Sequence, residues 1–153
     1  MIERTLVLLK PDAIQRGFVG DIISRFEHKG LKIAGMKMLC MSHDIAKNHY
    51  GEHEGKGFYK DLVEFIRSGP IVALIIEGDE AIAGIRKMVG STNPKEANPG
   101  TIRHDFGMHT GRNLIHASDS KKSAEREISI FFSIDEIMEY HKDEYKWVYE
   151  KLN

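Results

Sequence analysis

One histidine in this sequence has surroundings that suit chemistry. His116 lies in the segment 113–120, which reads Asn-Leu-Ile-His-Ala-Ser-Asp-Ser. Apolar residues precede it and small or helix-capping residues follow, so we expect His116 at the end of a strand and just ahead of a helix. A histidine placed there is displayed, and its neutral imidazole can attack an electrophile near pH 7. A satisfied polar residue at a turn is the plainer alternative.

Cationic and amide side chains accompany His116 at the ends of other predicted elements. Arginine presents a planar fork of donors that matches phosphate oxygens, and lysine adds a point charge. If these side chains converge on His116, they form a phosphate site. The cations are Lys10, Arg86, Arg103 and Arg112, and the neutral donors are Thr92 and Asn113.

A metal site built on His49 and His53 is a weaker hypothesis. The two residues are four apart and could share one helix face, but the His-Glu-x-x-His zinc pattern is missing. Gly51 and Gly55 also weaken any helix between them. We therefore expect both to be surface histidines.

Two nucleotide-related motifs fit the segment 51–59 poorly. Gly51–Gly57 has the look of a phosphate-binding P-loop, but it is one residue short and has glycine where a magnesium-binding Ser/Thr is required. Lys56–Tyr59 begins like an RNA-binding signature, but the small residue and alternating aromatics that should follow are absent. An RNA-binding or nucleotide-sensing module is the alternative function.

Size and composition indicate one cytosolic domain spanning residues 1–153. The hydrophobic content of 41% is enough for a core, and 22 basic against 23 acidic residues argue against an obligatory nucleic-acid partner. Cys40 is the single cysteine, which favours a reducing compartment and, for its side chain, a place in the core. The longest apolar run, Ile71–Ile76, is far too short to span a membrane.

The hydrophobic pattern predicts the elements that must position these residues. Their order suggests an α/β chain of the α+β kind, with a ferredoxin-like, four-stranded antiparallel sheet and helices on one face. The strands are expected at 5–9, 31–41, 71–76 and 113–117. The helices are expected at 19–26, after Ser42, through 62–66, and at 80–89 and 120–130, with a last short one after Ser133.

Two segments fall outside this pattern. Residues 91–112 contain two prolines and three glycines and show no period, yet they include apolar side chains, so we expect a long ordered functional loop. The C-terminal tail contains Tyr140, Tyr145, Trp147 and Tyr149, and this aromatic surface is expected to pack on this subunit or on a neighbour.

Motifs along nearly the whole chain resemble those of the nucleoside diphosphate kinase family. The most specific are Lys10-Pro-Asp12 and the segment around His116. The others are 68–70 (Ser-Gly-Pro), 90–94 (Gly-Ser-Thr-Asn-Pro), 99–103 (Pro-Gly-Thr-Ile-Arg), 105–106 (Asp-Phe) and 147–150 (Trp-Val-Tyr-Glu). Ala117 departs from the glycine that is common in the family, a modest change beside His116.

The resemblance implies a role for each site residue. His116 would take the γ-phosphoryl group of a nucleoside triphosphate and pass it to a diphosphate, Glu127 would hold the other ring nitrogen, and Ser118 would support Glu127. The transferring phosphate and the ribose 3′-hydroxyl would be met by Lys10, Tyr50 and Asn113. The diphosphate would be held by Arg86, Thr92 and Arg103, and the base would stack on Phe58.

The resemblance also implies partners and assembly. ATP, GTP, ADP, GDP and other nucleotides would serve as substrates, because stacking tolerates any base. Mg²⁺ would be carried by the nucleotide phosphates and not by a protein cage. Relatives of this length are usually hexamers, so a homo-hexamer in the cytoplasm is expected.

Overall fold

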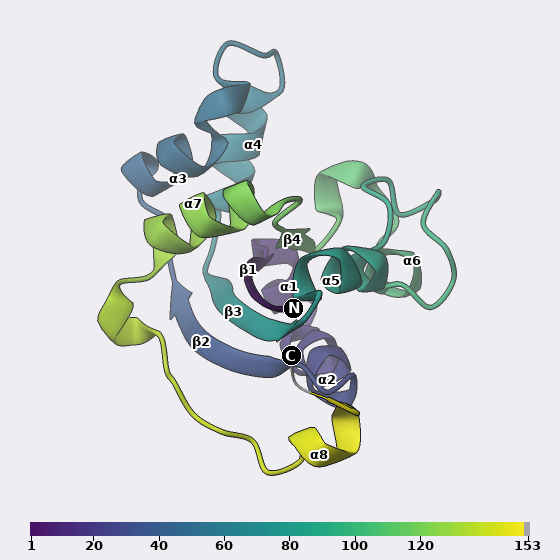
Figure 1. Cartoon of the computed structure of the whole chain (residues 1–153). Coiled ribbons are helices and arrows are strands. Elements are labelled where there is room, and N and C mark those ends of the chain that lie inside the picture. Colours follow the sequence, from purple (N-terminus) through teal and green to yellow (C-terminus); the bar gives the residue numbers. More distant parts are fainter. Residues whose placement is uncertain (152–153) are drawn as a thin grey trace.

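The computed structural model describes residues 1–151, which form one four-stranded sheet with helices around it (Figure 1). The strands are β1 (Ile2–Leu9), β2 (Lys32–Leu39), β3 (Ile71–Asp79) and β4 (Ile115–Ala117). The α-helices are α1 (Pro11–Gln15), α2 (Val19–His28), α3 (His43–Tyr50), α4 (Tyr59–Ile66), α5 (Ala81–Val89), α6 (Ile102–Phe106), α7 (Lys121–Phe131) and α8 (Tyr145–Val148). Single 3-10 turns are η1 (Gly51–His53), η2 (Thr110–Arg112) and η3 (Ile134–Glu136).

The strands run in the order β2-β3-β1-β4, and every neighbouring pair is antiparallel. This confirms the ferredoxin-like sheet expected from the sequence. In the pairing of β1 with its two neighbours, Leu8 lies opposite Ala73 of β3 and opposite His116 of β4. Because directly paired residues point to the same face, His116 faces the side of the sheet to which Leu8 points.

Helices cover both faces of the sheet, which corrects our expectation of one covered face. Val7 and Leu9 point into a core shared with α2 and α5, whereas Leu6 and Leu8 point into a core shared with α3, α4 and α7. Figure 1 shows α3, α4 and α7 on one side and α2 and α5 on the other. Alternate residues of the central strands β1 and β3 point to opposite faces of the sheet, and both sets are apolar. Both faces of the sheet must therefore be covered by helices.

Serine residues begin three helical segments, as the sequence predicts. The Ser42 hydroxyl accepts a hydrogen bond from the Ile45 amide at 3.1 Å, and the Ser120 hydroxyl accepts one from the Ser123 amide at 3.1 Å. Ser133 opens η3 with a capping box. Each cap satisfies backbone N–H groups that would otherwise lack a partner at a helix start. The cap at Ser120 fixes the start of the helix that follows His116.

The expected loop at 91–112 contains short helices that the sequence pattern does not predict. Helix α6 begins after Thr101, whose hydroxyl accepts a hydrogen bond from the His104 amide at 3.2 Å. A helix of five residues has too few apolar positions to show a period. The segment is therefore compact and keeps Ile102 in the core at 0% exposure.

Two smaller expectations, on Cys40 and on the start of β4, need correction. Cys40 is exposed and is not part of the core, because it lies just beyond the last residue of the edge strand β2. β4 begins at Ile115 and not at Asn113, because Leu114 adopts a left-handed φ of 72° that a strand cannot continue. Among the described residues, no helix is long and apolar enough to cross a membrane.

Candidate active site

His116 occupies the middle of β4 and faces the layer formed by α3 and α7. Its side chain is 25% exposed, so the ring is both supported by the protein and open to a ligand. The strand fixes the backbone through its pairing with Leu8 of β1. Among the described strands, β4 is an edge strand that pairs with β1 alone, so no further strand lies against its outer side.

Glu127 of α7 holds one nitrogen of His116. The Nε2–H group donates to Oε1 of Glu127 at 2.6 Å, and the Ser118 hydroxyl donates to the same oxygen at 2.8 Å. Burial alone would raise the pKa of Glu127, but the hydrogen bonds from His116 and Ser118 outweigh it and hold that pKa below its usual value. A charged carboxylate at Nε2 fixes the tautomer in which Nδ1 carries the lone pair.

Lys10, Asn113 and Thr92 form a connected group near His116. The Lys10 ammonium donates to the Asn113 side-chain oxygen at 2.8 Å, and the Asn113 amide nitrogen donates to the Thr92 carbonyl at 3.0 Å. Burial, together with the charge of Arg103, lowers the pKa of Lys10 to about 8. Asp12 only partly offsets these effects, and a phosphate group would stabilise the charged form of Lys10 further.

Arg103 is buried with 4% of its surface exposed, and it braces the backbone around the site. Its guanidinium donates to the carbonyl groups of Asn113 at 3.3 Å, Gly90 at 3.1 Å and Ile115 at 2.7 Å. A guanidinium has five N–H donors, so two are left for a ligand. Burial and the neighbouring Arg86 lower the pKa of Arg103 to about 10. Arg86 also donates to the Ala117 carbonyl at 3.3 Å.

Asp12 and Leu114 are functional positions that our reasoning on single residues did not assign. Leu114 holds a left-handed backbone two residues before His116. Its amide donates to Asp12 Oδ2 at 3.0 Å, and its carbonyl accepts from the Lys10 amide at 2.8 Å. The Lys10-Pro-Asp12 motif therefore holds the strained turn at Leu114, which orients His116. In the sequence, this motif was the signal from which the role of Asp12 could have been found.

The structure contradicts the expectation that His49 is a surface residue. His49 is 3% exposed, and its ring lies edge-to-face against His116 with the ring centroids 4.7 Å apart. Burial and the neighbouring His116 lower the pKa of His49 to about 3. Tyr50 follows it at the end of α3, buried, and its hydroxyl has no hydrogen-bond partner within residues 1–151. The centroid of the His53 ring lies 5.5 Å from that of Phe58 and 6.4 Å from that of Tyr50.

Phe58 lies at one side of a hollow of about 280 Å³ between α4 and η2. Its ring is 52% exposed, unlike that of any core aromatic residue. The hollow is otherwise lined by Asp61, Leu62, Phe65, Thr110, Gly111 and Arg112. Phe58 occupies the N-cap position of α4, so the RNA-binding signature of a central strand does not apply to it. A flat apolar ligand could stack against this ring.

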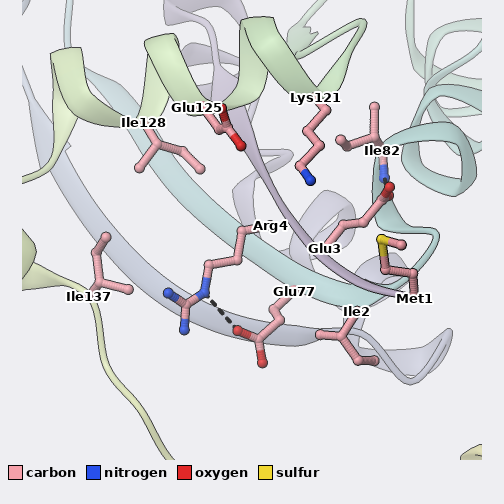
Figure 2. A pocket seen from close by; sticks show the side chains of 10 residues that line it. All are labelled: Met1, Ile2, Glu3, Arg4, Glu77, Ile82, Lys121, Glu125, Ile128 and Ile137. Atoms are coloured by element: carbon pink, nitrogen blue, oxygen red, sulfur yellow. Dashed lines mark hydrogen bonds and ion pairs between the residues drawn. The ribbon is translucent and has the colours of Figure 1, made fainter. Parts of the chain in front are cut away.

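A larger hollow of about 500 Å³ lies elsewhere, between β1 and α7 (Figure 2). Arg4 and Glu77 lie side by side on its wall and form an ion pair, with Nε of Arg4 2.7 Å from a Glu77 oxygen. Its wall has three carboxylates, on Glu3, Glu77 and Glu125, against three cations, on Arg4, Lys121 and the amino terminus of Met1. The hollow therefore has no surplus of positive charge for a polyphosphate, so the group around His116 is the better phosphate site.

Known proteins with this sequence pattern and this fold are phosphotransferases that act on nucleotides. The family model for nucleoside diphosphate kinases matches residues 3–137. The nucleoside diphosphate kinase of Archaeoglobus fulgidus is 57% identical over 98% of this chain and 99% of its own length. The enzyme of Methanobrevibacter smithii is 56% identical over 98% of this chain and 100% of its own.

Solved structures agree with these sequence matches. A halophilic nucleoside diphosphate kinase from Halobacterium salinarum, in complex with CDP, superposes with a TM-score of 0.95 at 46% identity, over 97% of this chain and 99% of its own. The Aquifex aeolicus enzyme superposes with a TM-score of 0.88 at 42% identity, over 90% of this chain and 100% of its own. The chain belongs to the nucleoside diphosphate kinase family.

Proposed function

We propose that this enzyme moves the γ-phosphoryl group of a nucleoside triphosphate to a nucleoside diphosphate by way of a phosphohistidine on His116. The observation that supports this most is the 2.6 Å contact between Nε2 of His116 and Glu127. This contact commits Nε2 to the protein and leaves Nδ1 as the free nucleophile. A covalent intermediate lets donor and acceptor use one site in turn, which gives ping-pong kinetics.

In the first half-reaction, the Nδ1 lone pair forms a bond to the γ-phosphorus while the bond from that phosphorus to the β–γ bridging oxygen breaks. The diphosphate leaves with the bonding electrons. The proton on Nε2 stays there, and the Glu127 carboxylate stabilises the positive charge that develops on the ring. In the second half-reaction, a terminal oxygen of a new diphosphate attacks the phosphorus and the bond to Nδ1 breaks.

The cations beside His116 would bind the phosphates. We assign the transferring phosphate and the ribose 3′-hydroxyl to Lys10, Tyr50 and Asn113, and the diphosphate to Arg86, Thr92 and Arg103. Support comes from the shared contacts of Lys10, Asn113 and Thr92, and from the lowered pKa values of Lys10 and Arg103, which reflect cations in need of an anion. Phosphoryl transfer depends mainly on such positioning and charge neutralisation.

Mg²⁺ fits this arrangement when it is carried by the nucleotide. Ammonium, guanidinium and amide N–H donors suit phosphate oxygens, whereas Mg²⁺ prefers an octahedral set of oxygen ligands, which the cations beside His116 do not supply. The ion would neutralise charge on the phosphates during transfer.

Specificity is proposed to be broad. A base stacked on the exposed ring of Phe58 is recognised by its face, which all bases share. The relative from Halobacterium salinarum was solved with a pyrimidine nucleotide, CDP, which is consistent with this proposal. Contact with the 3′-hydroxyl and not the 2′-hydroxyl would admit ribo- and deoxyribonucleotides, and kcat/KM for GDP, dGDP, CDP and dTDP should agree within about tenfold.

The proposed assembly is a homo-hexamer. Surfaces suited to contacts between subunits include Met36 and Met38 on the edge strand β2, 59% and 61% exposed, and Trp147 of α8, 83% exposed. Exposed apolar side chains on an unpaired edge favour association. Sedimentation equilibrium at micromolar concentration should give the mass of six chains, and a monomer or dimer there would refute the proposal.

A single-turnover experiment tests the proposed reaction. The protein is mixed with Mg²⁺ and γ-labelled ATP without acceptor, and its intact mass and acid stability are measured. We expect one acid-labile phosphoryl group, lost when GDP is added as labelled GTP appears. His116→Ala should bind nucleotide but show neither event. An unlabelled wild-type protein would instead favour the nucleotide-sensing alternative.

A further inference from the structure

His49 carries two ring nitrogens that have no hydrogen-bond partner within residues 1–151. The rings of Tyr50, His116 and Phe131 surround it at 4.5, 4.7 and 5.4 Å between centroids. Leaving a buried polar group unpaired costs about 1–3 kcal/mol. A phenylalanine would fill the same aromatic surroundings without that cost, so packing alone does not account for an imidazole here.

The free nitrogens of His49 lie beside two further metal-ligating side chains. His49, His116 and Glu127 each offer one ligand atom, and these atoms all lie within 4.8 Å of one another. They come from α3, β4 and α7, and α3 and α7 pack against each other. Two imidazoles and a carboxylate form a ligand set that zinc uses when its fourth position stays open.

The surroundings of this trio also resemble those of a zinc site. Ser118 donates to Glu127 at 2.8 Å, and Arg126 lies 3.6 Å from the other carboxylate oxygen, so the carboxylate is oriented by outer contacts. Glu127 and His49 are buried, whereas the His116 side chain is 25% exposed. A metal ion could therefore enter from the substrate side and keep a water molecule as its fourth ligand.

We propose that His49, His116 and Glu127 bind Zn²⁺ and that this binding reversibly inhibits the enzyme. Tetrahedral zinc places its ligand atoms about 3.3 Å apart. The 2.6 Å contact between Nε2 of His116 and Glu127 would therefore lengthen, and His49 would move inward. The inhibitory part of this inference rests on the proposed role of His116.

Inhibition follows from the tautomer of His116. Zinc binds Nε2 through its lone pair, so the proton that Nε2 now donates to Glu127 moves to Nδ1. A protonated Nδ1 has no lone pair with which to attack phosphorus. Zinc at this position thus blocks phosphorylation without occupying the phosphate or base positions, and a chelator restores activity by removing it.

Metal binding is tested directly with Co²⁺, which replaces Zn²⁺ and absorbs visible light strongly when it is tetrahedral. Wild-type protein titrated with Co²⁺, in the absence of nucleotide, should develop these bands up to one ion per chain and lose them when Zn²⁺ is added. His49→Phe should show no bands. His141→Gln, which removes an exposed histidine of the tail, should behave as the wild type. Absent wild-type bands, or bands that persist in His49→Phe, would overturn the zinc site.

Folding of the variant is controlled separately. Circular dichroism and thermal melting should show His49→Phe to be at least as stable as the wild type, because an unpaired polar group is replaced by an apolar ring of similar shape. His49→Gln serves as a second variant that lacks the imidazole but remains polar. It too should lose the cobalt bands, and a folded His49→Gln that keeps them would contradict the proposal.

Inhibition is measured as the rate of phosphohistidine formation from Mg²⁺ and ATP, with and without Zn²⁺. We expect at least a tenfold decrease in the wild type, reversed by EDTA, and less than a twofold decrease in His49→Phe. Similar decreases in both proteins would mean that zinc acts on the nucleotide, against the proposal. The two proposals can be refuted separately. If the protein is not phosphorylated by Mg²⁺ and ATP in the absence of zinc, the proposed role of His116 is wrong. The cobalt spectra decide the metal site in either case.

Discussion

At the scale of single residues, Lys10 is a cation whose charged form is destabilised by its surroundings. Its ammonium is held by Asn113 at 2.8 Å, and burial together with Arg103 lowers its pKa to about 8. Below this pKa the free enzyme has the positive charge that a phosphate needs, and above it the charge is lost. The pKa of Lys10 thus sets an upper pH limit on the free enzyme.

We expect kcat/KM for ATP to fall as the pH rises through about 8. A guanidinium keeps its charge throughout this range, so Lys10→Arg should show a flatter profile even if its maximum is lower. Steady-state rates from pH 6 to pH 10 measure this. A wild-type profile that stays flat to pH 10 would exclude Lys10 as the titrating group.

Glu127 is a second residue with a measurable electrostatic effect. Glu127→Gln keeps an oxygen that can accept the hydrogen bond from Nε2 but removes the negative charge. Charged hydrogen bonds are about twice as strong as neutral ones, so the loss of about 1.4 kcal/mol should slow phosphohistidine formation about tenfold. Rapid-quench kinetics gives this rate. Glu125→Gln, an exposed position on the same helix, should leave it unchanged.

At the scale of elements, the link between α5 and the loop that follows depends on one glycine. Gly90 ends α5 with φ of 88°, and its carbonyl accepts a hydrogen bond from Arg103 at 3.1 Å. A Cβ atom at Gly90 would lie 2.6 Å from the Thr101 hydroxyl oxygen. Gly84, in the middle of the same helix, has no atom within 4 Å of such a Cβ.

Alanine substitutions at these two glycines should change the free energy of unfolding in opposite directions. Gly90→Ala should lower the free energy of unfolding by about 1–3 kcal/mol, because alanine is strained at this φ and clashes with Thr101. Gly84→Ala should raise it by about 0.5–1 kcal/mol, because alanine favours a helix interior. Urea denaturation of both variants measures this. Equal changes in the free energy of unfolding would show that a side chain at position 90 does not strain the backbone.

At the scale of the whole molecule, Glu77 joins the sheet to the tail. It is 8% exposed, and its carboxylate lies 2.6 Å from the Lys32 ammonium and 2.7 Å from Arg4. Lys32 also donates to the Tyr140 carbonyl at 3.0 Å, and Arg4 pairs with Glu139. Burial opposes ionisation of Glu77, but hydrogen bonds from Lys32 and Arg4 outweigh it and lower its pKa.

A carboxyl group whose pKa is lower in the folded state stabilises the protein above its unfolded pKa and loses this contribution as the pH falls through the folded value. Glu77 should therefore stabilise the fold at pH 6 and lose this contribution progressively as the pH falls below the unfolded pKa of a glutamate, about 4.3, and through its lower folded value. Glu77→Gln should be less stable than the wild type at pH 6, and the gap should narrow at pH 3.5. Urea unfolding at both values measures it, and a constant gap would show that charge is not the cause.

The sequence by itself determined the local features of this protein. The apolar run Ile71–Ile76, the caps at Ser42 and Ser120 and the glycine after Val89 depend on neighbours within a few residues, so the elements that they mark could be predicted. The family resemblance identified the class, and it pointed to the group formed by His116, Glu127 and Ser118, which the structure brings together.

Only the tertiary structure decided which residues far apart in the sequence meet. His49 was expected at the surface, because the zinc pattern is missing and Gly51 and Gly55 weaken a helix between His49 and His53. It is buried because α3 packs against α7, so its ring lies on His116, 67 residues further along the chain. Helices on both faces of the sheet and the clamp between Asp12 and Leu114 likewise arise from packing and long-range hydrogen bonds. Such contacts leave no local period for the sequence to show.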